Sequence, residues 1–141
     1  MVFSSIGGWL GLTAAKKESI KSEINIMDAI HAHVQWKVRL QNYLNGTSEE
    51  VLDPMATCRD DQCALGKWIH GPALTHFHDQ DAFHKLRADH AQFHFIAGTV
   101  VKKVQDSDRA GATTLMEGDY AHTSHKVVLA LNALHQHVMS E

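Results

Sequence analysis

The chain is poor in the residues that break helices or cross-link a fold. Its 141 residues include only two prolines and two cysteines. Because proline interrupts helices more strongly than any other residue, its scarcity permits long helices. Two cysteines exclude the framework of disulfide bonds on which small secreted domains depend. We therefore expect a reducing compartment, with at least one thiol available for metal or redox chemistry.

Long apolar runs and an excess of basic charge are also missing. The formal net charge is −3 with neutral histidines, which argues against a nucleic-acid-binding surface. Residues 1–15 are fairly apolar but lack the basic segment with which a secretory signal begins. The basic residues Lys16-Lys17 follow the apolar run rather than precede it. This stretch is also too short and too rich in glycine to cross a bilayer. The sequence thus predicts a cytoplasmic protein that does not bind nucleic acid.

Two parts of the chain differ in how well they specify a structure. Residues 1–21 are predicted to be an N-terminal segment, either flexible or used for docking. Contact of this segment with a membrane surface is a further alternative, and its glycines weaken any helix there. Residues 22–141 are long enough for one hydrophobic core and are predicted to form a single helical domain.

Apolar side chains in this domain recur at steps of three and four, the period of an amphipathic helix. The pattern predicts long helices over residues 22–45, 81–105 and 108–139, and a short helix over residues 62–70. Ser22 is expected to cap the first helix, and Asn45-Gly46 to end it. The expected fold is all-α. It is an antiparallel four-helix-type bundle of three long helices plus one short helix that carries Cys63.

The predicted connections hold the polar and turn-forming residues. Thr47-Ser48-Glu49-Glu50 resembles a capping box that opens one turn of helix, and Asp53-Pro54 is expected to end that turn. Cys58 is expected in the polar loop that follows, as an ordinary exposed thiol or as the partner of an oxidised Cys63. Residues 73–80 are predicted to be a linking turn.

The short helix places a cysteine where a thiolate is favoured. With Asp60 or Asp61 as its cap, Cys63 falls in the first turn, close to unpaired backbone N–H groups and the positive end of the helix dipole. Gly66 inside this helix lowers its stability by about 1 kcal/mol relative to alanine. We therefore expect another helix to pass very close to Gly66.

Three of the 12 histidines lie on predicted inward faces. His33 is on the core face of the first helix, and His90 and His94 lie one above the other on the core face of a later one. Zinc is bound in proteins by tetrahedral sets of imidazole nitrogen and thiolate sulfur. The spacing favours a zinc site at these histidines and Cys63, and hydrogen-bonded core histidines are the alternative.

These residues form a pattern that resembles a known family. His33-x-x-Trp36, Cys63-x-Leu65-Gly66-x-Trp68 and His90-x-x-x-His94 look like the signature blocks of the bacterial chemoreceptor zinc-binding (CZB) domain, over roughly residues 25–140. The resemblance implies a small helical bundle, commonly a homodimer. It also implies one zinc ion per chain, with the ligands His33, Cys63, His90 and His94.

The resemblance further implies a role in signalling. Such domains usually accompany chemoreceptors or diguanylate cyclases, and zinc controls their output, so chemotaxis or cyclic-di-GMP regulation is expected. The cysteine ligand is also implicated in sensing oxidants. No signalling or catalytic domain is expected within these 141 residues. We therefore expect a stand-alone module without enzyme activity, in which zinc occupancy or cysteine oxidation shifts the bundle and controls a signalling partner in trans.

Other functions for such a site are the alternatives. A zinc buffer would need the same ligands but no partner. A hemerythrin-like di-iron bundle would need bridging acids on the inward helical faces, which carry almost none. A zinc hydrolase would need an open position on the metal and a general-base glutamate beside the histidine pair. We expect four protein ligands and no such glutamate.

Further residues are expected around the site. Trp36 and Trp68 are expected to be core walls that keep the metal dry, with a separate ligand site as the alternative. Asp28 or Asp89 is expected to orient a ligand imidazole. The core stripe predicted for the last helix includes Ser124. The remaining histidines are expected at the surface or an interface, or at a second metal site: His31, His70, His76, His78, His84, His122, His125, His135 and His137.

Overall fold

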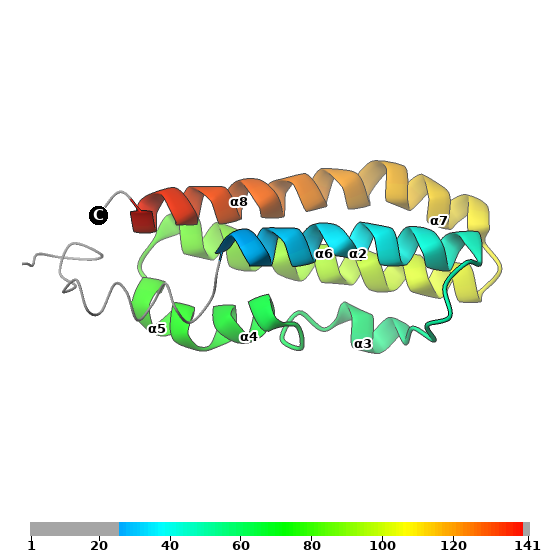
Figure 1. The fold of residues 1–141 in the computed structure, drawn as a ribbon, viewed down its shortest axis with the longest axis horizontal. Coiled ribbons are helices and arrows are strands. Elements are labelled where there is room, and N and C mark those ends of the chain that lie inside the picture. Colours follow the sequence, from blue (N-terminus) through cyan, green and yellow to red (C-terminus); the bar gives the residue numbers. More distant parts are fainter. Residues whose placement is uncertain (1–25, 140–141) are drawn as a thin grey trace, which may run out of the picture.

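The computed structural model describes residues 26–139, and this part of the chain is helical throughout its regular structure (Figure 1). The first three elements are α2 (Ile26–Asn45), α3 (Pro54–Cys58) and α4 (Ala64–His70). They are followed by α5 (Pro72–Phe77), α6 (Asp81–Gln105) and α7 (Arg109–Leu115). The π-helical turn η2 (Met116–Tyr120) and α8 (Ala121–Met139) complete the fold.

These elements form an up-and-down bundle with one interrupted member. In Figure 1, α2 and α6 run in one direction, and α8 runs in the opposite one. The chain returns from α2 to α6 through the short helices α3, α4 and α5. The all-α bundle is therefore confirmed, and its fourth member is a row of three short helices.

The predictions for residues 1–21 and for the Ser22 cap lie outside the described residues. Within residues 26–139, no helix is both long enough and apolar enough to cross a membrane.

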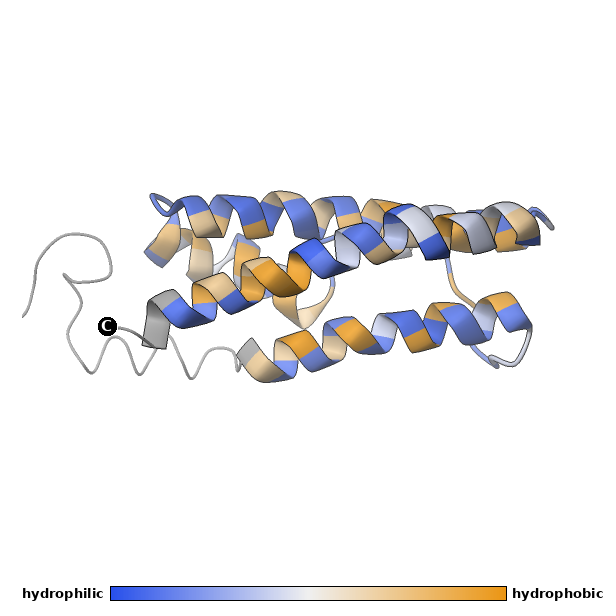
Figure 2. Cartoon of the chain, turned by 90° about the horizontal axis from the view of Figure 1, so that it is seen from above, coloured by the Kyte–Doolittle hydropathy of each residue, from blue (hydrophilic) through white to orange (hydrophobic). Residues whose placement is uncertain are grey.

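The central helix of the bundle is α6, which packs against α2, α3, α5, α7, η2 and α8. Phe83, Leu86, Ala97 and Val101 on its inward face are fully buried. Figure 2 shows polar and apolar residues alternating along the long helices, as expected for helices with one buried face. Each buried Phe, Leu or Val side chain contributes about 1.5–3 kcal/mol, so the inward face of α6 is a principal source of stability.

The segment before α3 differs from the prediction. Residues 47–53 contain no helix, and the Ser48 hydroxyl accepts the N–H of Glu50 at 3.0 Å. The prediction that Asp53-Pro54 ends a helix was wrong, because this pair begins α3. Proline suits the first helical position, where its missing N–H has no helical partner. The Asp53 carboxylate caps the helix by accepting the N–H of Met55 at 3.2 Å.

α3 lies directly on α6, at a glycine that lets the two backbones approach. A β-carbon on Gly98 would lie 2.7 Å from the carbonyl oxygen of Pro54 and 2.1 Å from Sγ of Cys58. Cys58 is accordingly the last residue of α3, half-buried against α6, with Sγ 3.8 Å from the carbonyl oxygen of Phe95. The polar loop predicted for Cys58 therefore begins one residue later.

Proline begins a second helix where a linking turn was predicted. Gly71 ends α4, and Pro72 is the first residue of α5. The predicted turn over residues 73–80 is thus mostly helical, since α5 extends to Phe77 and only three residues separate it from α6.

The last predicted helix, over residues 108–139, is interrupted once. It begins after Asp108, whose carboxylate accepts the N–H of Gly111 at 2.9 Å. A π-helical turn, Met116–Tyr120, then separates α7 from α8. Such a turn inserts one extra residue into the helical ladder and is frequent near functional sites.

Candidate metal centre

α6 directs two histidines one turn apart into the interior. His90 and His94 are 1% and 2% exposed, and their ring centroids lie 4.6 Å apart. The ring of Phe93 lies 5.3 Å from that of His94 and packs against it edge-on. The prediction that both histidines share the inward face of this helix is therefore confirmed. Burying two imidazoles is costly unless they find partners.

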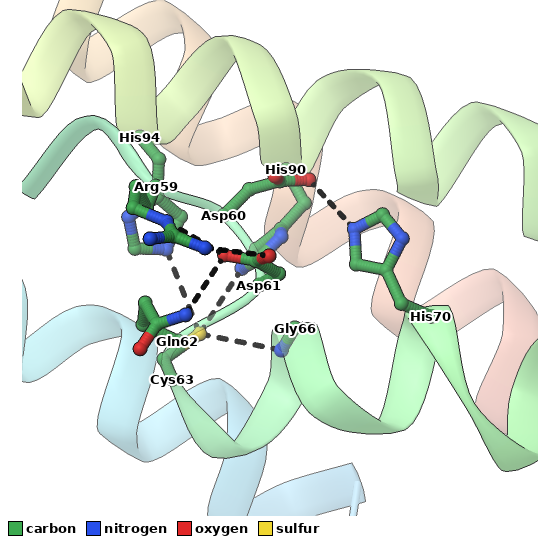
Figure 3. Close-up of polar contacts among 9 residues, drawn as sticks. All are labelled: Arg59, Asp60, Asp61, Gln62, Cys63, Gly66, His70, His90 and His94. Atoms are coloured by element: carbon green, nitrogen blue, oxygen red, sulfur yellow. Dashed lines mark hydrogen bonds and ion pairs between the residues drawn. The ribbon is translucent and has the colours of Figure 1, made fainter. Parts of the chain in front are cut away.

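Cys63 reaches the same place from the start of α4 (Figure 3). It is the N-cap of that helix, and its Sγ accepts the N–H of Gly66 at 3.3 Å. The capping role predicted for Asp60 or Asp61 belongs to Cys63, because the helix begins only at Ala64. The sulfur thus lies against the unpaired N–H groups of a helix start, where negative charge is stabilised.

The glycine in α4 makes room for the loop that precedes the helix. A β-carbon on Gly66 would lie 1.7 Å from the carbonyl oxygen of Asp60 and 3.1 Å from Cα of Asp61. The preceding loop, and not the neighbouring helix that was predicted, therefore requires glycine here. An ion pair between Arg59 and Asp61 at 3.2 Å and a hydrogen bond between His70 and Asp60 at 3.0 Å hold this loop.

Three ligand atoms from α4 and α6 meet. Sγ of Cys63 lies 3.5 Å from Nε2 of His90 and 3.6 Å from Nε2 of His94 (Figure 3). All three atoms lie within 4.8 Å of one another. One metal ion can bridge such a group, since Zn–S bonds are about 2.3 Å and Zn–N bonds about 2.0–2.1 Å long. Imidazole and thiolate without carboxylate suit zinc or another late transition metal rather than magnesium or calcium.

A backbone carbonyl fixes the nitrogen that His94 offers. Nδ1 of His94 donates to the carbonyl oxygen of Thr57 in α3 at 3.0 Å. Because a carbonyl oxygen can only accept, the proton is on Nδ1 and the lone pair is on Nε2, the atom that faces Cys63. This carbonyl has, for His94, the orienting role predicted for Asp28 or Asp89. Asp28 lines the same pocket as the histidines, so its orienting role stays a prediction, and Asp89 pairs with a lysine one turn earlier.

His33 approaches from α2 but lies outside the group of three. It is 4% exposed. Together with Cys63, His90 and His94 it lines a pocket of about 260 Å³ between α2, α4 and α6. Its Nε2 lies 3.1 Å from the hydroxyl oxygen of Ser124 on α8. Within the described residues, the set of ligand atoms closer than 4.8 Å to one another does not include His33. The structure thus brings this histidine to the wall of the site.

Burial keeps the imidazoles neutral. It lowers the pKa of His33 to about 4 and the pKa of His90 to about 3, and repulsion from His94 is the next cause in both. Burial also lowers the pKa of His94, and the hydrogen bond to Thr57 opposes this shift. Neutral imidazole is the form that binds a metal. Burial raises the pKa of the Cys63 thiol, so this ligand is the one that must release a proton to the solvent.

The two tryptophans take different places. Trp36 lines the pocket, and its ring meets that of His94 edge-on, with 5.9 Å between centroids. Trp68 is 4% exposed and lies 6.2 Å from the ring of Phe77 in α5. Trp36 therefore walls the pocket, whereas Trp68 anchors the helix that carries Cys63.

No second site is found among the described histidines. His70 pairs with Asp60, and His122 and His125 point to solvent on α8. Within residues 26–139, no second group of three metal-ligating side chains comes as close together as Cys63, His90 and His94.

Two hydrogen-bond partners of the predicted ligands were not assigned from the sequence. Ser124 was predicted on a core stripe, and a hydroxyl among apolar residues is a signal for a buried hydrogen bond. Thr57 acts through its backbone carbonyl, for which the sequence carries no signal.

Comparison with known proteins points to one family. Residues 33–101 match the model of the chemoreceptor zinc-binding domain, a range that contains Cys63, His90 and His94. No curated protein and no solved structure matches the chain. The metal of this family is zinc, and the set of one half-buried thiol and two buried imidazoles fits one zinc ion. Residues 33–101 of the chain therefore form a chemoreceptor zinc-binding domain.

Proposed function

We propose that this chain is a zinc-responsive regulatory module whose site consists of His33, Cys63, His90 and His94. Zinc occupancy, or oxidation of Cys63, shifts the packing of the short helices and so controls a signalling protein in trans. One observation carries the proposal: Cys63 is both the cap of α4 and a member of the group of ligands on α6. A metal held there ties α4 to α6.

The fourth ligand is proposed because structural zinc sites are almost always tetrahedral. His33 is buried, lines the same pocket as the other three residues, and is neutral near pH 7 because burial lowers its pKa to about 4. With four protein ligands, no position is open for a reacting water. This argues for a regulatory site without enzyme activity and against a zinc hydrolase.

The absence of carboxylates from the clustered ligands argues against a di-iron centre. Bridging Asp or Glu residues would be required there.

Packing around the ligands supports a regulatory response. Cys63 connects the site to α4, and the Thr57 carbonyl connects His94 to α3. Both short helices belong to the interrupted member of the bundle. Gain or loss of the metal therefore acts on the shortest helices of the fold.

Oxidation is the second proposed input. A hypochlorous acid molecule would convert the Cys63 thiolate into a sulfenic acid with release of chloride, which removes the sulfur ligand and leaves the three imidazoles. Mass spectrometry of the Cys58→Ser variant after mild oxidation tests whether Cys58 is the partner of the oxidised Cys63 sulfur.

The proposed partner is a chemoreceptor or a diguanylate cyclase, as in the signalling systems that such domains serve. A zinc buffer is the competing function. To separate them, cyclic-di-GMP synthesis by a cyclase, or binding to a chemoreceptor, is measured with the chain in zinc and in chelator. A regulator changes the output with zinc, and the change disappears in Cys63→Ser. A buffer acts only through the free zinc concentration, which a metal-buffered medium holds constant.

A homodimer in the cytoplasm is also proposed. Met27, Val34 and Val38 are 56%, 45% and 51% exposed on one face of α2, and a face of this kind suits a second copy of the chain. Light scattering of wild type and Val34→Asp tests this. The N-terminal segment, residues 1–21, is proposed to dock on the partner, and partner binding by the chain without this segment tests that role.

Metal content is the first experiment. Elemental analysis of the purified chain should give one zinc per chain, and clearly less in Cys63→Ser and in His33→Ala. The exposed variant His122→Ala is the matched control and should keep its zinc. Full zinc content in both ligand variants would refute the four-residue site.

A further inference from the structure

His33 makes a hydrogen bond that competes with metal binding. Nε2 of His33 lies 3.1 Å from the hydroxyl of Ser124, which connects α2 to α8. His33 also lies against Phe93, with ring centroids 4.1 Å apart, so the ring is held on two sides. In this position it lines the pocket but lies outside the group of three ligand atoms.

We propose that Ser124 is the competing partner of His33, and that zinc takes His33 by displacing the Ser124 hydroxyl from Nε2. The inference rests on the proposed role of His33 as fourth ligand. A ring nitrogen bound to a metal has neither a proton to donate nor a free lone pair to accept with. The same nitrogen therefore cannot serve Ser124 and zinc at once.

The arrangement of the other ligands supports Nε2 as the zinc-binding atom of His33. His90 and His94 both direct Nε2 toward Cys63. While Nε2 of His33 is bonded to Ser124, the ring remains outside the 4.8 Å set. His33 must therefore move to complete the tetrahedron, and the bond that resists this movement is the one to Ser124.

The consequence reaches α8. Ser124 lies in the first turn of α8, four residues after Tyr120, the last residue of the π-helical turn. Release of its hydroxyl frees it to bond a backbone carbonyl one turn earlier, as serines in helices do. Zinc binding thus exchanges a contact between α2 and α8 for a bond within the last helix, next to its irregular turn.

The test is the affinity for zinc of Ser124→Ala. Removal of the competing hydroxyl should tighten zinc binding by about 2- to 10-fold, the effect of one hydrogen bond of ordinary strength. Thr99→Ala is the matched control, because it removes a helical hydroxyl that bonds only the carbonyl of Phe95. It should leave the affinity unchanged. Ser124→Thr retains a hydroxyl and should restore the wild-type affinity.

A double-mutant cycle separates competition from a general loosening of the bundle. In the His33→Ala background, Ser124→Ala should have no effect on zinc affinity, because the competed ring is gone. If Ser124→Ala weakens zinc binding, or leaves it unchanged in a chain that circular dichroism shows to be folded, the inference is wrong. Weakening would mean that Ser124 orients His33 for the metal.

A second measurement uses the wild-type chain. Nitrogen-15 NMR of the His33 ring, recorded with and without zinc, should identify Nε2 as the metal-bound nitrogen. Binding through Nδ1 with a retained Ser124 bond would overturn the inference. If the wild-type chain binds no zinc, the proposed function fails as well. If the chain binds one zinc through His33 but Ser124→Ala weakens the binding, only the proposed competition by Ser124 fails.

Discussion

The contact between Gly98 and α3 predicts that one added methyl group disturbs both the bundle and the metal centre. In Gly98→Ala the β-carbon would lie 2.7 Å from the Pro54 carbonyl oxygen and 3.0 Å from the Cys58 nitrogen. Both atoms belong to the backbone and cannot rotate away. Reaching an ordinary contact of about 3.4 Å requires α3 to move by about 0.7 Å (3.4 − 2.7).

The magnitude follows from two opposing effects. Overpacking of a close contact costs about 1–3 kcal/mol, and replacing glycine by alanine within a helix offsets about 1 kcal/mol of this. Because two backbone atoms of α3 are involved, we expect Gly98→Ala to lower the unfolding free energy by about 1–2 kcal/mol. For a chain of this size, this corresponds to a fall in Tm of about 3–8 °C.

Zinc affinity should fall with it. Moving α3 carries away the Thr57 carbonyl that holds Nδ1 of His94. Loss of such an outer contact typically weakens metal binding by about 10- to 100-fold, and a displacement of this size should give about 10-fold. Urea unfolding measures the first effect, and competition with a chromogenic chelator measures the second.

Gly118→Ala is the control, because a β-carbon there meets nothing within 4 Å. That variant should be unchanged or more stable by about 0.5–1 kcal/mol, with normal zinc affinity. If Gly98→Ala proved as stable as Gly118→Ala and bound zinc equally well, the close packing of α3 on α6 would be refuted.

Three further predictions concern protonation and local structure. With a chelator present, the unfolding free energy should fall as the pH is lowered from 6.5 toward 4, by about 1.4 kcal/mol per pH unit for each of His33 and His90. In this pH range the unfolded chain binds protons on His33 and His90, whereas the folded chain does not. If urea titrations gave the same unfolding free energy across the range, the burial of both histidines would be contradicted. Asp53→Ala removes the cap of α3 and should cost about 0.5–2 kcal/mol in the same assay, whereas Asp53→Ser should cost little. Gly66→Ala places a β-carbon 1.7 Å from the Asp60 carbonyl oxygen, so elemental analysis should find most of the zinc lost.

The features that the sequence predicted well are local ones. The long helices follow from apolar side chains spaced at three and four, and this spacing also fixes the shared face of His90 and His94. Cys63 could be placed at a helix start because the predicted helix is short. A polar or glycine-containing turn bounds it on each side. In each case a window of a few residues holds the whole signal.

The features that were missed depend on residues far away in the chain. Asp53-Pro54 can end one helix or begin another, and the packing of α3 on Gly98 of α6 decides in favour of the second. The bond between His33 and Ser124 joins two helices that no local pattern relates. The need for Gly66 was recognised, but whether loop or helix fills the space beside it depends on the path of the chain through Asp60.

The interrupted member of the bundle has a consequence for amide hydrogen exchange. Its helices have five, seven and six residues, too few to persist alone in water. They can therefore open while the long helices stay folded. Because Cys63 lies at the start of α4, the full set of ligands is assembled only in the closed arrangement. If zinc binds that arrangement alone, a free concentration of about 100 times its Kd lowers the open population about 100-fold. The exchange rates of the α4 amides should then slow by that factor, so they measure zinc occupancy without any probe attached to the site.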